Sequence, residues 1–229
     1  MKDKLISWFF IGLLIIGSLI MAYPKINDIW NSMFAAQVIT EYDSQIEDMD
    51  DRRYENMWEE AFQYNMNLAN KPYQSSLTEE EWNEYENVLN INRSGMMGYL
   101  EFALIDIRIP IYHGTDKATL QNAVGHLEWT SLPVGGKTSH CVLAAHSGLP
   151  TAELFSNLEK AKVGDIFELH VLEKKLRYEI DQIYVVKPEE INELMIVEGE
   201  DYCTLVTCTP YGINTHRLLV RGRRINEFT

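Results

Sequence analysis

The chain has 229 residues and a mass of 26.5 kDa, which suits one folded domain with a single core. Its composition, 46% hydrophobic and 24% charged, is ordinary for a globular protein. The formal net charge of -14 argues against nucleic acid as the main partner, because phosphate binding needs a basic surface.

The N-terminus carries an uncharged apolar run at residues 5–23, preceded by Lys2 and Lys4. As a helix this run would span about 28 Å, close to one hydrocarbon core. The two lysines place the N-terminus in the cytoplasm. The run is longer than the apolar part of a usual signal peptide and has no clear cleavage site, so an uncleaved anchor is favoured over a cleaved signal. We therefore expect residues 1–24 to anchor the protein in the cell membrane by a single pass, with the rest outside the cell.

Residues 25–92 form a second region, which we expect to be helical. Apolar residues recur at helical spacing through residues 30–70, on an acidic background, and Pro72 ends this pattern. Thr78 and Glu81 have the spacing of a capping box, which predicts another helix after them.

Residues 93–229 have a different texture, with short β-rich segments separated by turns marked with Gly and Pro. Many short strands with few helices are typical of a closed antiparallel barrel. One short helix is expected at residues 152–161, capped by Thr151.

The three cysteines are Cys141, Cys203 and Cys208, and an odd number leaves at least one free thiol. None of them forms a CxxC pair, so a structural zinc site is not expected. His140 and His146 flank Cys141, but on a strand the two histidines would lie about 20 Å apart, too far for one ion. We expect no metal site.

The sequence around Cys208 predicts two neighbouring antiparallel strands, at residues 202–208 and 217–222. Cys208 ends the first strand and Arg217 begins the second, so their side chains can lie side by side. Cys203 is five positions before Cys208 and therefore faces the other side of the strand, which argues against a disulfide between them.

A guanidinium beside a thiol favours the thiolate and can hold a developing oxyanion. A nucleophilic cysteine also needs a proton carrier, usually histidine. Of the six histidines, His146 is best placed, since it follows an apolar strand and faces a loop. These residues alone leave two alternatives open: a structural histidine, and a Cys208 that is merely buried.

The segment TLVTCTPYGINTHRLLVRGRR resembles the signature of sortases, the cysteine transpeptidases of Gram-positive cell surfaces. GYLEF, IPIYHGT, VGHLEWTSLPVGG and VLAAHSGLPTAELFSNL are similar to the class C branch, which polymerises pilins. The resemblance covers about residues 90–225. It implies a mainly β fold, the eight-stranded sortase barrel with short helices, as a catalytic unit at residues 93–229. It also implies that no cofactor is needed.

By the same resemblance His146, Cys208 and Arg217 match the catalytic triad. Cys208 is expected to attack the Thr–Gly bond of a Leu-Pro-x-Thr-Gly-like sorting signal and form a thioacyl enzyme, with His146 as proton carrier and Arg217 holding the oxyanion. The implied acceptor is a pilin lysine. The alternatives are a cell-wall amine, as in a housekeeping sortase that anchors surface proteins, or a catalytically silent scaffold. The positions that line the groove are matched by Ser147, Gly148 and Thr207.

Two departures from class C concern the lid and the C-terminus. Members usually carry an Asp-Pro-aromatic lid, whereas this chain has Lys71, Pro72 and Tyr73 there. A lysine near Arg217 would repel it, so we expect a degenerate, displaced or absent lid with at most weak autoinhibition. Members also commonly have a second membrane helix after the barrel, which the residues up to Thr229 do not include.

Overall fold

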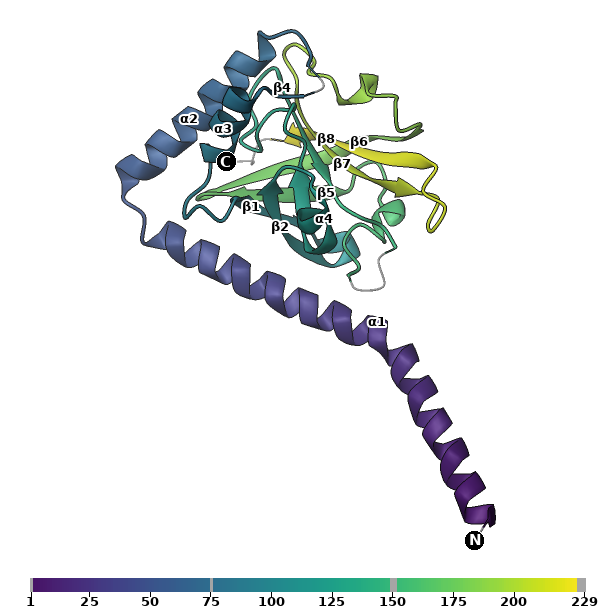
Figure 1. The fold of residues 1–229 in the computed structure, drawn as a ribbon. Helices are drawn as coiled ribbons and strands as arrows, with labels where there is room; N and C mark the ends of the chain where they lie inside the picture. The colour runs from purple at the N-terminus through teal and green to yellow at the C-terminus, as the bar shows by residue number, and fades with distance from the viewer. Residues whose placement is uncertain (1, 75, 149–151, 226–229) are drawn as a thin grey trace.

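A computed structural model describes residues 2–74, 76–148 and 152–225, with side chains from Ile6 onward. Within these ranges eight strands close into a barrel in the order β1-β2-β3-β4-β7-β8-β6-β5 (Figure 1). The strands are β1 (Met96–Phe102), β2 (Ile107–His113), β3 (Val124–His126), β4 (Ser139–Ala144), β5 (Ile166–Val171), β6 (Lys174–Val186), β7 (Asp201–Thr209) and β8 (His216–Ile225).

The expected eight-stranded barrel is confirmed, but it is not wholly antiparallel. The pairs β2–β3 and β4–β7 are parallel. A parallel pair needs a crossover connection rather than a tight hairpin. The chain supplies one through α4 (Lys117–Asn122), between β2 and β3, and another through the long excursion of β5 and β6 between β4 and β7.

The other helices precede the barrel: α1 (Lys2–Glu47), α2 (Asp51–Ala69) and α3 (Glu79–Asn87). The helical pattern expected over residues 30–70 is thus divided between two helices. Asp50 caps the second, because its side chain accepts a hydrogen bond from the Arg52 N–H at 2.8 Å. The capping box of Thr78 and Glu81 is present and begins α3.

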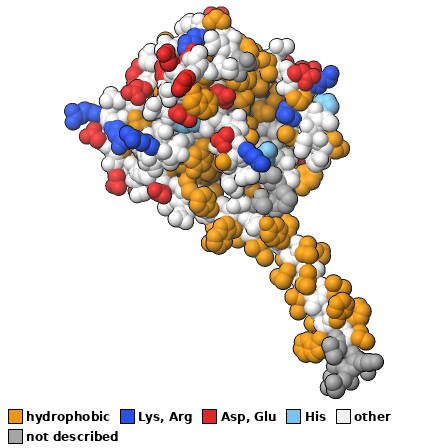
Figure 2. All heavy atoms as spheres, viewed as in Figure 1, with side chains coloured by type: hydrophobic (Ala, Val, Ile, Leu, Met, Phe, Trp, Pro, Cys, Tyr) orange, Lys and Arg blue, Asp and Glu red, His pale blue; other side chains and the backbone are white. Residues whose placement is uncertain are grey.

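The first half of α1 projects away from the barrel and is covered with hydrophobic side chains (Figures 1 and 2). Among the described residues one helix segment, Ile6–Glu47, is long and apolar enough to cross a membrane. Its most apolar window is not buried against any part of the protein. A lipid environment is the ordinary way to cover such a surface.

Helix α3 and the second half of α1 both contribute residues to the hydrophobic core of the barrel. On α1, Tyr42 is buried, and its hydroxyl donates to the Met97 carbonyl at 2.9 Å and accepts from the Leu172 N–H at 2.8 Å. On α3, the buried Tyr85 hydroxyl lies 2.9 Å from Nδ1 of His126. The helical extension is therefore packed on the barrel rather than tethered to it.

The prediction of a helix at residues 152–161 is wrong. Thr151, its expected cap, lies outside the described residues. The segment forms turns followed by a short 3₁₀ helix, Leu158–Lys160. Leu154 has a φ of 38°, which an α-helix does not allow. The Phe155 N–H donates to the His146 carbonyl at 3.1 Å instead of to a helical partner. Leu154, Phe155 and Leu158 are all buried, and their spacing in the sequence is the one that an apolar helix face would also have.

Candidate active site

Alternate residues of β4, β7 and β8 face the barrel core and the outside. On β7, Cys203 and Leu205 belong to the core, whereas Val206 belongs to a separate apolar cluster. We call this second group, Val142, Leu194, Val206 and Leu219, the outer cluster. Cys208 follows Val206 by two positions and Arg217 precedes Leu219 by two, so period-two alternation places both on the outer face.

Cys208 and Arg217 are paired directly across the antiparallel β7–β8 ladder. This is the juxtaposition that the hairpin pattern predicts. Both residues are half-buried. Nη1 of Arg217 donates to the carbonyls of His216 at 3.1 Å and Asn214 at 3.4 Å, which holds the guanidinium at the start of β8. Among the described residues no partner is recorded for its other nitrogens, so they can bind a substrate oxygen.

His146 lies two residues beyond the end of β4. The parallel register pairs Ala144 with Val206, and the Ala145 N–H continues the ladder to the Val206 carbonyl at 3.1 Å. Extending this register by two residues sets His146 level with Cys208. Three strands therefore bring the three predicted residues to one edge of the outer face.

The residues matched to the groove occupy different environments. Thr207 faces away from Cys208, is 4% exposed and donates its hydroxyl to the Ala145 carbonyl at 2.8 Å, so it holds the segment before His146 rather than lining an open groove. Ser147 and Gly148 are half-buried in the loop that follows His146.

Tyr211, in the β7–β8 loop, is a neighbour that the sequence pattern did not single out. A Cβ atom added to Gly148 would lie 2.9 Å from its ring, so the ring packs directly against the Gly148 backbone. The contact joins the loops after His146 and after Cys208. In the sequence, Tyr211 could have been found only as an aromatic residue shortly after the strand end that carries Cys208.

The opposite end of the outer face is covered by the β6–β7 connection. His140, near the start of β4, lies 2.9 Å through Nδ1 from the Met195 carbonyl, and Nε2 lies 2.7 Å from the Thr204 hydroxyl. Since a carbonyl only accepts, Nδ1 carries the proton and Nε2 accepts from Thr204. Leu194 of the same connection belongs to the outer cluster. The outer face is therefore covered at its His140 end, whereas Cys208, at the other end, is half-buried.

Lys71, Pro72 and Tyr73 lie at this covered end. Lys71 forms an ion pair with Glu81 at 3.1 Å, and the Tyr73 ring packs edge-on against Trp129 with centroids 5.2 Å apart. All three residues line a cavity of about 830 Å³, together with Trp129 and residues 194–196. His146, Cys208 and Arg217 are not among its lining residues. Lys71 is therefore held by its ion pair with Glu81, instead of being repelled by Arg217 as the sequence led us to expect.

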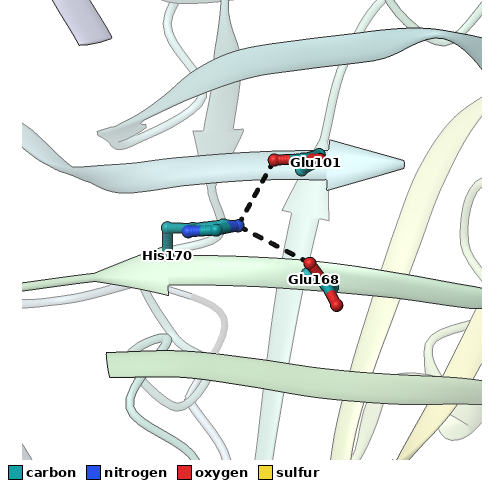
Figure 3. Close-up of side chains that lie close together, drawn as sticks. All are labelled: Glu101, Glu168 and His170. Atoms are coloured by element: carbon teal, nitrogen blue, oxygen red, sulfur yellow. Dashed lines mark ion pairs between the residues drawn. The ribbon is translucent and has the colours of Figure 1, made fainter. Parts of the chain in front are cut away.

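Elsewhere on the barrel, one group among the described residues has the composition of a metal site. Figure 3 shows His170 between Glu101 and Glu168, with Nε2 at 3.4 Å and 3.8 Å from their carboxylate oxygens. Glu168 is also paired with Lys175 and Arg177, each at 3.1 Å. A metal ion would have to compete with these cations. The group is better described as an ion-pair network that links β1, β5 and β6.

A family model described as the sortase domain matches residues 100–225. Sortase D of Bacillus subtilis (strain 168) is 25% identical over 162 residues, covering 69% of this chain and 79% of that protein. Sortase A of Streptococcus agalactiae serotype III (strain NEM316) is 29% identical over 139 residues, covering 58% of this chain and 56% of that protein.

Solved structures of sortase C are more similar. Sortase C1 from Streptococcus agalactiae is 43% identical with a TM-score of 0.82, covering 84% of this chain and 100% of that chain. Sortase C of Streptococcus pneumoniae, described with respect to catalysis and pilin substrate specificity, is 46% identical with a TM-score of 0.75, covering 84% and 98%. Sortase C of Clostridium perfringens with the C-terminal cell wall sorting motif is 44% identical with a TM-score of 0.74, covering 84% and 100%.

Proposed function

Because the chain belongs to the sortase family of cysteine transpeptidases, we propose that it cleaves a Leu-Pro-x-Thr-Gly-like sorting signal between Thr and Gly and joins the new carbonyl end to a pilin lysine. The observation that carries this proposal is the register that places Cys208, Arg217 and His146 at one edge of the outer face. The similarity to several sortase C structures supports the pilin acceptor.

In the first half-reaction the Cys208 thiolate attacks the threonine carbonyl carbon. The oxygen of the tetrahedral intermediate becomes negative, and the guanidinium of Arg217 stabilises it through directed N–H donors. When the C–N bond breaks, His146 gives a proton to the departing glycine amine. The product is a thioester between Cys208 and the threonine carbonyl.

In the second half-reaction the acceptor amine attacks the thioester. His146 removes a proton from the amine as the new C–N bond forms, and the Cys208 thiolate leaves. Arg217 again holds the oxyanion. The half-buried setting of the three residues leaves room for substrate while limiting the access of water, which would otherwise hydrolyse the thioester.

The proposal is tested by cleavage of a fluorogenic peptide that contains Leu-Pro-x-Thr-Gly, with the full chain in detergent or with residues 25–229. Cys208→Ala should reduce the rate to that of peptide alone, because no other group can form the thioester. The matched control is Cys203→Ala, which removes the same atom from the core side of β7. Cleavage by Cys208→Ala at the rate of the parent would refute the mechanism.

The acceptor is tested separately by incubation with purified pilin subunits or with a peptide that carries a cell-wall bridge amine. A pilin polymerase should give a ladder of covalent products that disappears when the acceptor lysine is replaced by arginine. A single attachment to the wall-bridge peptide, without a ladder, would assign the chain the housekeeping role instead. An uncut peptide and no ladder would point to a silent scaffold.

We further propose that α1 anchors the protein in the cell membrane by a single pass, with the barrel outside. Its apolar first half and the preceding Lys2 and Lys4 support this orientation. Just beyond that half, the carboxylate of Asp28 accepts from the Glu153 N–H at 3.1 Å. This bond attaches the loop after His146 close to the base of the anchor, near the substrates that a membrane retains.

A further inference from the structure

Two buried cysteines outside the candidate active site face each other in the barrel core. Cys141 on β4 and Cys203 on β7 are direct partners in the parallel ladder. They are 1% and 0% exposed, and both belong to the core cluster. Cys208 lies on the outer face, so the reaction proposed above uses neither of them.

The backbone geometry allows a bond between these two sulfurs. Neighbouring strands lie about 4.8 Å apart, and disulfides join residues whose Cα atoms are about 4.4–6.8 Å apart. Direct ladder partners also point their side chains to the same face of the sheet. The two thiols are close enough to influence each other's pKa. Closure therefore needs small side-chain rotations and no exchange of strand partners.

The surroundings of the two thiols differ in the folded barrel. Cys141 lies beside His126, whose ring is held by the Tyr85 hydroxyl at 2.9 Å and the Ser131 carbonyl at 2.8 Å. Burial by itself raises the pKa of both thiols, but the interactions with Cys203 and His126 bring the pKa of Cys141 below the ordinary thiol value. The pKa of Cys203 stays well above it.

We propose that Cys141 and Cys203 are a dithiol that closes into a disulfide when the chain folds in the presence of a disulfide oxidant. The thiolate of one cysteine attacks the oxidant, forms a mixed disulfide and releases one thiol. The other cysteine then loses its proton, attacks the sulfur of the first and releases the second thiol. The protein gives up two electrons and two protons, and the oxidant becomes two thiols.

The inference draws on the proposed location of the barrel outside the membrane, where disulfides persist. Both sulfurs are inaccessible in the closed barrel, so the oxidant must react before β4 and β7 have paired or during their local opening. The bond would then join the two strands that lead to His146 and Cys208. Cys208 would remain the one reduced thiol.

The test counts thiols in the full chain in detergent. Protein unfolded in denaturant with a reductant is refolded either with that reductant or with a mixture of reduced and oxidised glutathione. It is then unfolded again in acid, alkylated and weighed by mass spectrometry. We expect three labels after reducing refolding and one after oxidative refolding, with a peptide map that links Cys141 to Cys203.

Two variants make the count specific. Cys208→Ala should carry two labels after reducing refolding and none after oxidative refolding. Cys203→Ala should carry two labels in both, and if it fails to fold, the Cys208→Ala arm still decides. Three labels after oxidative refolding, or a linked peptide that contains Cys208, would overturn the proposal. Labelling does not depend on activity, so failure of the transpeptidase assignment would appear only in the peptide-cleavage assay.

Discussion

His140 joins β4, β7 and the β6–β7 connection at the covered end of the outer face. It does so through its hydrogen bonds with Thr204 of β7 and Met195 of the connection. Burial, assisted by the charge of Arg221, lowers its pKa from 6.5 to about 4, while the Met195 carbonyl and Asp181 act in the opposite direction. The neutral imidazole satisfies both partners, since Nδ1–H donates to the Met195 carbonyl and Nε2 accepts from the Thr204 hydroxyl. Burial, rather than these hydrogen bonds, disfavours the charged form of the ring.

This arrangement predicts a specific loss of stability in acid. Because the folded pKa lies below the unfolded value, the contribution of His140 is complete above pH 6.5 and is lost as pH falls through 4. The full loss is about 3 kcal/mol. In urea unfolding between pH 7 and pH 4, His140→Gln should lose less stability than the parent, because glutamine donates and accepts at all these pH values. Equal pH slopes for the two proteins would contradict the assignment.

At the scale of the elements, the helical extension places the segment of Lys71, Pro72 and Tyr73 against Trp129. This position is at the covered end of the outer face, and the cavity that the segment lines does not include Cys208. The Lys71–Glu81 pair connects this segment to α3, whose Tyr85 is fixed in the core. The segment therefore acts as part of the packing of the extension on the barrel.

The expected consequence concerns autoinhibition. Tyr73→Ala should change the rate of peptide cleavage by less than about twofold, while removing an aromatic contact worth about 1 kcal/mol of the free energy of unfolding. Initial rates with the fluorogenic peptide, together with thermal melting, measure both effects. Lys71→Ala is the matched control, since it alters the same segment without the ring. A strongly raised cleavage rate for Tyr73→Ala would show that the segment does block the site.

Local sequence signals predicted the elements whose partners are close in the chain. The capping box of Thr78 and Glu81 and the Cys208–Arg217 neighbours of the β7–β8 hairpin were predicted in this way. Contacts between distant segments were not, because pairing of β4 with β7 depends on the order of strands around the barrel. The Cys141–Cys203 pair depends on that non-local register.

Packing in three dimensions also explains the other differences. The loop after His146 carries apolar residues at helical spacing, but its backbone bonds serve the neighbouring segments, so the predicted helix is absent. The ion pair of Lys71 with Glu81 was missed although the two residues are close in the chain. Residues 72–74, 76 and 77 belong to no helix or strand whose period would predict which side chains meet.

For the whole molecule, the part of α1 just beyond its apolar first half carries a stripe of exposed apolar side chains. These are Ile26, Ile29, Trp30, Met33 and Phe34, each at least half exposed. The opposite side of the same helix packs on the barrel through buried residues that begin at Ala35. A helix with one apolar face that continues from a membrane span fits the lipid–water interface.

We expect residues 25–229 to bind phospholipid vesicles through this stripe. The double variant Trp30→Ser with Phe34→Ser should bind about tenfold more weakly, because it removes two large apolar side chains from the lipid contact. Co-sedimentation with vesicles measures the partition, and Gln37→Ser, at an exposed polar position of the same helix, is the control. Equal binding of parent and double variant would exclude a lipid contact at the stripe.

The continuity of α1 has a consequence, under the proposed membrane anchoring, for how far the barrel could reach. A flexible linker would let the barrel explore a distance that grows as about 5–6 Å times the square root of its length in residues. Here α1 runs unbroken over 46 residues and is fastened to the loop after His146 at Asp28. Under the proposed anchoring, such a helix would hold the barrel at a fixed height above the lipid. The proposed substrates would then have to bring their cleavage site and acceptor amine to Cys208.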